Sequence, residues 1–127
     1  APVFEEWLCR GLVLRGLLRK TSPALAIIVS ALFFALIHGN IWQGFAAFSI
    51  GCLLGYVYWK TRSLKLTVLM HFVNNAASVV QSRIPAFDGA DTMKDVIPSV
   101  PMYWAIFAAC AAALLLCLLD MRKLGRN

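Results

Sequence analysis

The chain has 127 residues and a formal net charge of +6, and 61% of its residues are apolar while only 14% are charged. A soluble domain usually has about 45–50% apolar and about 25% charged residues, so an ordinary soluble globular domain is excluded. The basic excess does not indicate nucleic-acid binding, because Lys and Arg lie at the ends of apolar segments, where membrane topology places them.

The apolar residues fall in long blocks. Asp, Glu, Lys and Arg are absent from residues 21–59, 66–82 and 96–119. About 20 mostly apolar residues cross a bilayer as a helix, and a helix satisfies its own backbone polar groups there. We therefore predict an all-α fold, a polytopic transmembrane bundle of about five helices, as a single domain over residues 1–127. The chain opens without Met and almost directly on a charged motif, so we expect a piece of a longer protein.

The first predicted helix, about residues 3–18, begins with "EEWLCR". Glu6 and Arg10 are one helical turn apart and can pair on one face, which lowers the free-energy cost of burying them. Glu5 is rotated by about 100° from Glu6 and is not explained by the same partner. Because ionisable residues inside membrane segments are usually functional, Glu5 is the first candidate site residue.

The second predicted helix covers about residues 22–38. Ser22 suits an N-cap and Pro23 suits the first helical turn. Gly39 suits the C-terminal end, directly after His38. This His is one of only two in the chain.

The third predicted helix, about residues 41–59, carries small residues four apart at Ala47, Gly51 and Gly55. Small residues at this spacing let helix backbones approach closely. We interpret them as packing inside the bundle rather than as a dimer contact.

The fourth predicted helix, about residues 63–80, carries His71 with Asn75 one turn later. An apolar helix must direct such side chains toward protein or water rather than lipid. A polar loop over residues 83–101 follows. The fifth predicted helix, about residues 102–119, is the most uniformly lipid-like.

The basic residues indicate a topology, because cytoplasmic loops carry an excess of Lys and Arg. Alternating crossings place three basic clusters on one face, which we take as cytoplasmic: Arg15, Arg19 and Lys20; Lys60, Arg62 and Lys65; Arg122, Lys123 and Arg126. At about 1.5 Å per residue, Glu5 and His38 fall toward the opposite face and His71 nearer the middle.

The polar residues inside apolar helices suggest two kinds of chemistry. A single His in an apolar helix is more often a hydrogen-bonded core residue than a ligand. Taken together, however, Glu5, His38 and His71 suit general acid–base catalysis. The same three side chains also suit a water-activating metal site, which needs three N or O ligands. A haem held by both His residues and a non-enzymatic scaffold are further alternatives.

Three motifs occur in order on apolar helices. They are EExxxR at Glu5, Glu6 and Arg10, FxxxH at Phe34 and His38, and HxxxN at His71 and Asn75. In this order and at these separations they resemble the CAAX proteases and bacteriocin-processing enzymes, the CPBP or Abi family of intramembrane endopeptidases. The resemblance is to the type II CAAX prenyl endopeptidases and covers about residues 1–80.

The resemblance implies an enzyme that hydrolyses a peptide bond at the membrane. Glu5 would act as general base on a water together with His38. His71 and Asn75 would stabilise the oxyanion or help to hold the site. Glu6 and Arg10 would pair and orient the first helix.

A second scheme makes Glu5, His38 and His71 the ligands of one divalent metal, with zinc the preferred candidate. The sequence leaves the metal-bound and metal-free schemes open. Asn75 is kept off the metal in both, because Asn is a better oxyanion donor than zinc ligand.

The resemblance also implies partners. The substrate would be a membrane-anchored protein or peptide, prenylated or a bacteriocin precursor, within a lipid bilayer and without nucleic acid. The expected location is the bacterial inner membrane. The alternative is a non-catalytic scaffold or bacteriocin self-immunity protein of the same fold.

Overall fold

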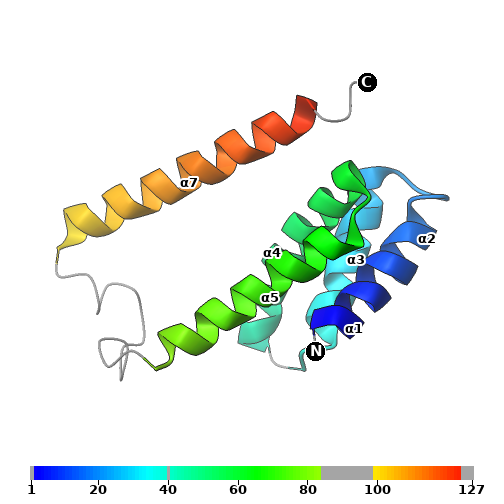
Figure 1. The fold of residues 1–127 in the computed structure, drawn as a ribbon, viewed down its shortest axis with the longest axis horizontal. Coiled ribbons are helices and arrows are strands. Elements are labelled where there is room, and N and C mark those ends of the chain that lie inside the picture. Colours follow the sequence, from blue (N-terminus) through cyan, green and yellow to red (C-terminus); the bar gives the residue numbers. More distant parts are fainter. Residues whose placement is uncertain (1, 40, 84–98, 124–127) are drawn as a thin grey trace. The chain divides into compact units, whose positions relative to one another are not determined.

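The computed structural model describes residues 2–39, 41–83 and 99–123, and every regular element in these ranges is a helix (Figure 1). The predicted all-α fold is therefore confirmed. The chain divides into two compact units, Ala1–Val73 and Asn74–Asn127. The first unit holds the helices that form the candidate site.

The first helical stretch is continuous but not uniform. It consists of α1 (Pro2–Glu6), the π-helix η1 (Trp7–Leu14) and α2 (Arg15–Leu17). The predicted helix over residues 3–18 agrees with these bounds, but the π-helical winding was not predicted. π-Helical turns are rare and occur frequently at functional sites. This one directly follows Glu5 and Glu6.

Helix α3 (Pro23–Leu36) begins as predicted and ends two residues before the predicted end at His38. The Ser22 hydroxyl accepts a hydrogen bond from the backbone N–H of Leu25 at 3.4 Å, and Pro23 occupies the first turn. Gly39 follows the helix with φ +67°, a left-handed conformation that glycine adopts without steric strain.

Helix α4 (Ile41–Thr61) packs along α3, and α3 also packs against η1. A Cβ atom on Gly51 would lie 3.0 Å from Ala31 Cβ, and one on Gly55 would lie 3.1 Å from Ile27 Cγ2. The predicted small-residue packing inside the bundle is therefore confirmed. The absence of side chains at these positions allows the two backbones to approach.

Helix α5 (Leu64–Gln81) begins after a short turn. The Ser63 hydroxyl accepts a hydrogen bond from the backbone N–H of Leu66 at 3.3 Å and caps the helix. The turn contains Arg62, whose φ of 54° lies in the left-handed region.

The last described helix is α7 (Val100–Lys123), in the second unit. Among the described residues, one helix, Val100–Asp120, is long and apolar enough to cross a membrane, while the apolar helix Pro23–Leu36 is shorter. Membrane crossing by several helices therefore stays a prediction.

Two buried apolar clusters hold the first unit together. One contains Cys9, Phe34 and Ala47. The other contains Leu14, Ala26 and Tyr58, with partly buried side chains packed around it, namely Leu17, Leu18, Ile27 and Leu64. The second cluster thus joins the end of α2, the start of α3, the end of α4 and the start of α5.

Candidate active site

Arg10 lies at the centre of a buried polar network in the first unit. Its Nη1 donates a hydrogen bond to Glu6 Oε1 at 2.8 Å, and both side chains are fully buried, so the predicted pair is confirmed. Its Nη2 donates to the backbone carbonyl of Gly51 at 3.0 Å. The guanidinium also lies over the Phe34 ring, 4.7 Å from the ring centroid. Arg10 therefore connects the first helical stretch to both α3 and α4.

The network is not fully satisfied within the described part of the chain. There, Glu6 Oε2 and Arg10 Nε are buried without a hydrogen-bond partner. Removing one member of a buried ion pair is strongly destabilising, because it leaves the other charge uncompensated. The fold therefore depends on Glu6 and Arg10 being present together.

His71, from α5, contacts both adjacent carboxylates of α1. Its Nδ1 lies 3.0 Å from Glu6 Oε1, and its Nε2 lies 3.6 Å from Glu5 Oε2. The His71 side chain is buried, whereas that of Glu5 keeps 24% of its surface exposed. The depth of these residues in a bilayer, expected from residue counting, stays a prediction.

The contact with Glu6 determines how the His71 ring is protonated. A carboxylate paired with Arg10 accepts hydrogen bonds but has none to donate, so His71 Nδ1 carries the proton toward Glu6. This assigns the tautomer from the hydrogen-bond network. The other ring nitrogen, Nε2, then faces Glu5, where proton chemistry can occur.

His38 lies in the turn after α3 and is held by the last part of that helix. Its Nδ1 lies 2.8 Å from the Phe34 carbonyl, so this nitrogen donates and Nε2 carries the lone pair. The Phe34 ring makes edge-on contacts with both imidazoles, at centroid distances of 4.7 Å to His38 and 5.4 Å to His71. One aromatic ring therefore positions both histidines of the chain.

Asn75 follows His71 by one turn of α5 and belongs to the second unit. Its side chain is half-buried, and its Oδ1 accepts a hydrogen bond from Asn74 Nδ2 at 3.5 Å. The oxyanion role of Asn75 stays a prediction.

A catalytic metal ion needs three protein ligands beside an open position. In the ranges that the structure describes, no three His, Cys, Asp or Glu side chains form a group that could hold one. Glu5 and His71 lie together, and the Nδ1 of His38 donates to a backbone carbonyl, which leaves its Nε2 free. Among the described residues, His38 does not join Glu5 and His71 in one group, so the three-ligand requirement is not met there. Zinc ligation by Glu5, His38 and His71 stays a prediction, and no step proposed below uses a metal.

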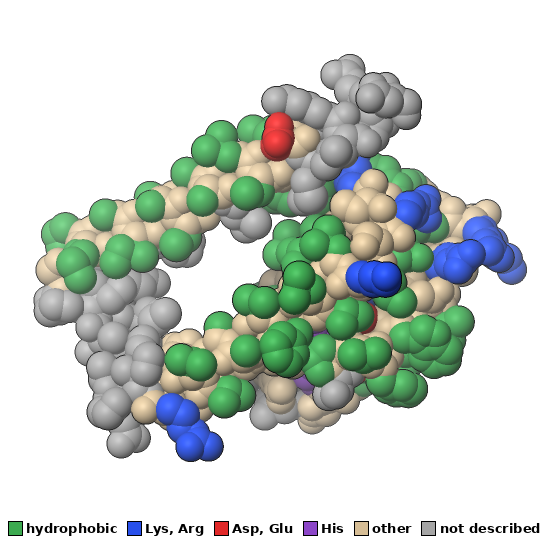
Figure 2. Space-filling model, viewed as in Figure 1, with side chains coloured by type: hydrophobic (Ala, Val, Ile, Leu, Met, Phe, Trp, Pro, Cys, Tyr) green, Lys and Arg blue, Asp and Glu red, His purple; other side chains and the backbone are tan. Residues whose placement is uncertain are grey.

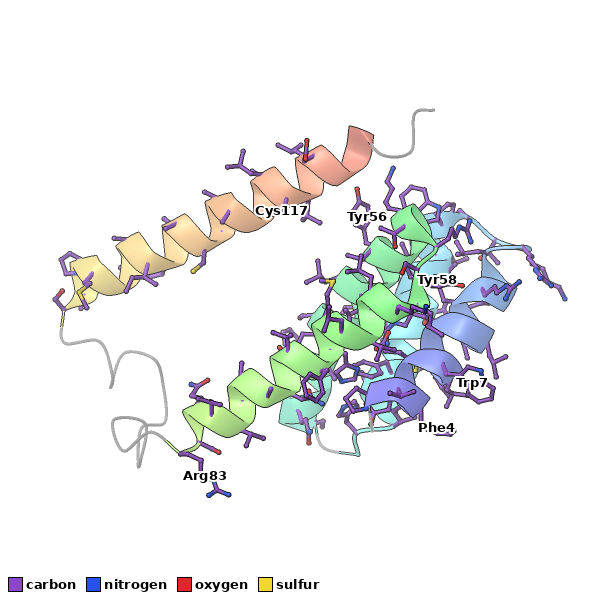
Figure 3. All side chains as sticks on the ribbon, in the orientation of Figure 1. Phe4, Trp7, Tyr56, Tyr58, Arg83 and Cys117 are labelled. Atoms are coloured by element: carbon purple, nitrogen blue, oxygen red, sulfur yellow. The ribbon has the colours of Figure 1, made fainter. Side chains whose placement is uncertain are left out.

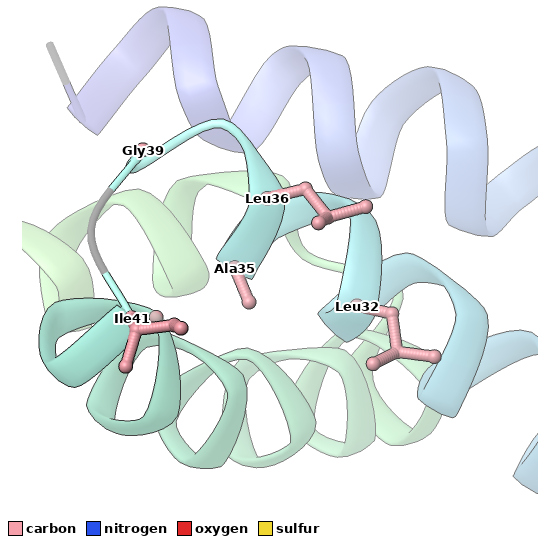
Figure 4. Close-up of a pocket in the computed structure, with 6 residues that line it drawn as sticks. Leu32, Ala35, Leu36, Gly39 and Ile41 are labelled. Carbon is pink, nitrogen blue, oxygen red and sulfur yellow. The ribbon is translucent and has the colours of Figure 1, made fainter.

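An apolar pocket of about 360 Å³ lies where α3 connects to α4 (Figure 4). It is lined by Leu32, Ala35, Leu36, Gly39, Ile41 and Gly44. These side chains carry no charge and no hydrogen-bonding group. The pocket therefore suits a hydrocarbon group, and its lining includes Gly39, the residue directly after His38.

Two residues near the site were not predicted to support it. Gly51 was interpreted as a packing residue alone, yet its carbonyl accepts from Arg10. Ser30 is buried on α3 and donates to the Cys9 carbonyl of η1 at 2.9 Å. A signal for Ser30 exists in the sequence, because a hydroxyl inside an apolar helix usually finds a partner. The signal does not say which partner.

A family model described as type II CAAX prenyl endopeptidase Rce1-like matches residues 1–77. The chain belongs to the Rce1-like family. The match confirms the resemblance and includes all three motifs, from Glu5 to Asn75. No curated protein and no solved structure matches the chain. The Rce1-like family is one of membrane-associated peptidases, which agrees with the predicted class of protein and with its apolar helices.

Proposed function

We propose that this Rce1-like chain is an intramembrane endopeptidase that hydrolyses a peptide bond with water activated by Glu5. The observation that carries the proposal is the position of His71 between Glu5 and Glu6, two carboxylates with different surroundings. Glu6 is fully buried and paired with Arg10, whereas Glu5 is partly exposed and so can meet a water and a substrate. This division separates an orienting carboxylate from a reactive one.

The proposed reaction begins with Glu5. Its carboxylate takes a proton from water as the water oxygen attacks the scissile carbonyl carbon. His71 Nε2 accepts a hydrogen bond from the protonated Glu5, and Glu6 holds the other side of the ring. When the C–N bond breaks, the proton passes to the leaving amine. The family resemblance implies that Glu5 acts together with His38, whereas the distance to Glu5 that supports a partner is that of His71.

His38 and Asn75 keep supporting roles in this scheme. The Nε2 of His38 is a second acceptor for a proton of the water, because its Nδ1 donates to the Phe34 carbonyl. The amide N–H groups of Asn75 are suitable donors to the developing oxyanion.

We place the reaction in a lipid bilayer, with several helices crossing it. Large apolar side chains are exposed along the first helical stretch, α3 and α5, as in Phe4 (63%), Leu36 (78%) and Phe72 (59%). Figure 2 shows apolar side chains over much of the visible surface, and Phe4 and Trp7 point outward (Figure 3). Such exposure suits lipid contact. The proposed location is the bacterial inner membrane, with the basic loops cytoplasmic.

The proposed substrate is a membrane-anchored protein or peptide with an apolar group such as a prenyl chain. The pocket between α3 and α4 supports this proposal through its apolar lining. The alternative is a scaffold or bacteriocin self-immunity protein of the same fold, which would cleave no peptide.

The test is peptide cleavage by the chain purified in mild detergent. Prenylated and unmodified membrane-anchored peptides are incubated with it, and products are identified by mass spectrometry. We expect cleavage that Glu5→Gln abolishes and His38→Ala lowers while thermal unfolding stays unchanged. Full activity in Glu5→Gln would exclude the mechanism. No cleavage by any preparation would favour the scaffold, and metal analysis of the active protein would test zinc ligation.

A further inference from the structure

We propose that the first unit binds the phosphate headgroups of anionic phospholipids at the end where α2 finishes and α4 turns into α5. The binding surface, called the basic surface here, consists of Arg15, Arg19, Lys20, Lys60, Arg62 and Lys65. The proposal concerns a lipid site apart from Glu5 and His71, and it does not depend on peptidase activity.

Packing brings the two halves of the basic surface together. Leu17 and Leu18, beside Arg15 and Arg19, contact the same buried cluster as Leu64, which is next to Lys65. Tyr58, close to Lys60, is part of that cluster. In Figure 2, Lys and Arg side chains gather over this end of the first unit. Residues far apart in sequence therefore present their charges on one end of the bundle.

No carboxylate of the first unit neutralises this charge. Glu5 and Glu6 are the only acidic residues between positions 1 and 73, and their ion pairs are with Arg10 and His71. Within the described residues, no ion pair involves a member of the basic surface. Like charges gathered without counter-charges repel one another, and an anionic partner relieves that repulsion.

A pair of aromatic residues near this end suits a position among lipid headgroups. Trp59 packs near Tyr56 at a centroid distance of 5.8 Å, and Lys60 Nζ lies 4.5 Å from the Trp59 ring centroid. Trp and Tyr favour the headgroup region of a bilayer. The aromatic pair therefore places the cations at the depth of lipid phosphates.

Arg62 gives the most specific indication. Its φ of 54° is a left-handed conformation that disfavours residues with a Cβ atom. Its backbone N–H donates to the Tyr58 carbonyl at 2.8 Å, which fixes the turn, and its side chain is exposed. Glycine would suit this backbone better. An exposed Arg kept at a strained position, without an ion-pair partner in the described structure, indicates a role for its charge.

The test measures thermal unfolding of the full chain in a neutral detergent, with added phosphatidylglycerol, phosphatidylcholine of the same acyl chains, or inorganic phosphate. A ligand that binds the folded state raises the midpoint. We expect phosphatidylglycerol to raise it by about 5 °C, and phosphatidylcholine and inorganic phosphate to leave it unchanged. A shift of equal size with both lipids would overturn the proposal. An equal shift with inorganic phosphate would assign the surface to the free ion instead of the lipid.

The discriminating variant is Arg62→Gly, with Arg83→Gln as its matched control. Arg83 is an exposed cation just past α5 and outside the basic surface (Figure 3). Arg62→Gly should raise the unfolding midpoint without lipid, because it relieves the strained φ, and should weaken phosphatidylglycerol binding about fivefold. Arg83→Gln should leave binding unchanged. Equal losses in the two variants, or an unchanged lipid affinity in Arg62→Gly, would contradict a specific surface.

Discussion

Glu6 Oε1 lies 3.0 Å from His71 Nδ1, although 65 positions separate the two residues in the chain. The same oxygen accepts a hydrogen bond from Arg10. Glu6 therefore does more than neutralise a neighbouring Arg, because it also orients the imidazole that faces Glu5. Carboxylates that orient a metal-ligating His typically contribute 10- to 100-fold to metal affinity or activity, and we expect an effect of this size for the His71 that faces Glu5.

We expect Glu6→Gln to lower kcat by about 10- to 100-fold, because the neutral amide holds His71 less firmly in one tautomer. It should also lower the unfolding temperature, since the buried Arg10 loses its counter-charge. Steady-state kinetics and thermal unfolding in detergent measure the two effects. Glu5→Gln is the matched control, with activity lost but stability kept. A wild-type kcat in Glu6→Gln would show that Glu6 does not orient His71.

Arg10→Ala should destabilise the folded state by about 3–5 kcal/mol, because Glu6 is left charged, buried and unpaired. Arg10→Lys should cost less, since it keeps the charge. Lys cannot, however, reproduce the planar fork that reaches both Glu6 and the Gly51 carbonyl. Thermal unfolding of both variants gives the comparison. A normal midpoint in Arg10→Ala would show that the ion pair does not support the fold.

Gly51→Ala should destabilise the protein by about 1–3 kcal/mol and lower kcat about tenfold. The new Cβ atom would lie 3.0 Å from Ala31 Cβ and 3.1 Å from Ala31 Cα, so α3 and α4 must separate where the Gly51 carbonyl binds Arg10. Gly55→Ala is the control, because its close contact is a methyl group of Ile27 and it has no bond to Arg10. Equal kcat values in the two variants would show that Gly51 contributes to helix packing only and does not support activity through Arg10.

Ser30→Ala should destabilise the fold by about 1 kcal/mol, because the Cys9 carbonyl of η1 loses a buried hydrogen bond. The matched control is Ser49→Ala, whose exposed hydroxyl donates to the Phe45 carbonyl within its own helix at 3.1 Å. That variant should be near neutral. Denaturant or thermal unfolding separates the two, and equal stability would mean that Ser30 does not help to hold the π-helix.

Gly44→Leu should raise KM for prenylated peptides about tenfold and leave unmodified peptides unaffected, because the new side chain fills the apolar pocket. A Cβ atom at Gly44 meets only the Ala35 carbonyl oxygen, at 3.6 Å, so this position has room for the first atom of a side chain. Gly16→Leu serves as the control, since its Cβ would meet nothing within 4 Å. Unchanged KM for every peptide would rule out the pocket as a lipid site.

Much of the local structure could be predicted from the sequence. Ser22 and Pro23 indicate where α3 begins, and Gly39 indicates where it ends. The pairing of Glu6 with Arg10 follows from one helical turn of spacing. Such features depend on backbone geometry over a few residues, and a helix repeats that geometry whatever it packs against.

The π-helical winding of η1 was not predicted, because the spacing of apolar residues in this short stretch fits an α-helix as well. The winding is accompanied by a contact from outside the segment, the hydrogen bond from Ser30 to the Cys9 carbonyl. No periodicity within residues 7–14 contains that information.

The sequence by itself therefore determined the approximate extents of the helices, the Glu6–Arg10 pair and the set of polar residues that need partners. Only the tertiary structure decided that His71 meets both Glu5 and Glu6, and that Arg10 reaches the Gly51 carbonyl. The physical reason is that these contacts depend on where helices cross. The crossing of α3 and α4, for example, is set by their close approach at Gly51 and Gly55. The spacing of small residues in the sequence permits such an approach but does not give the angle at which the two helices cross.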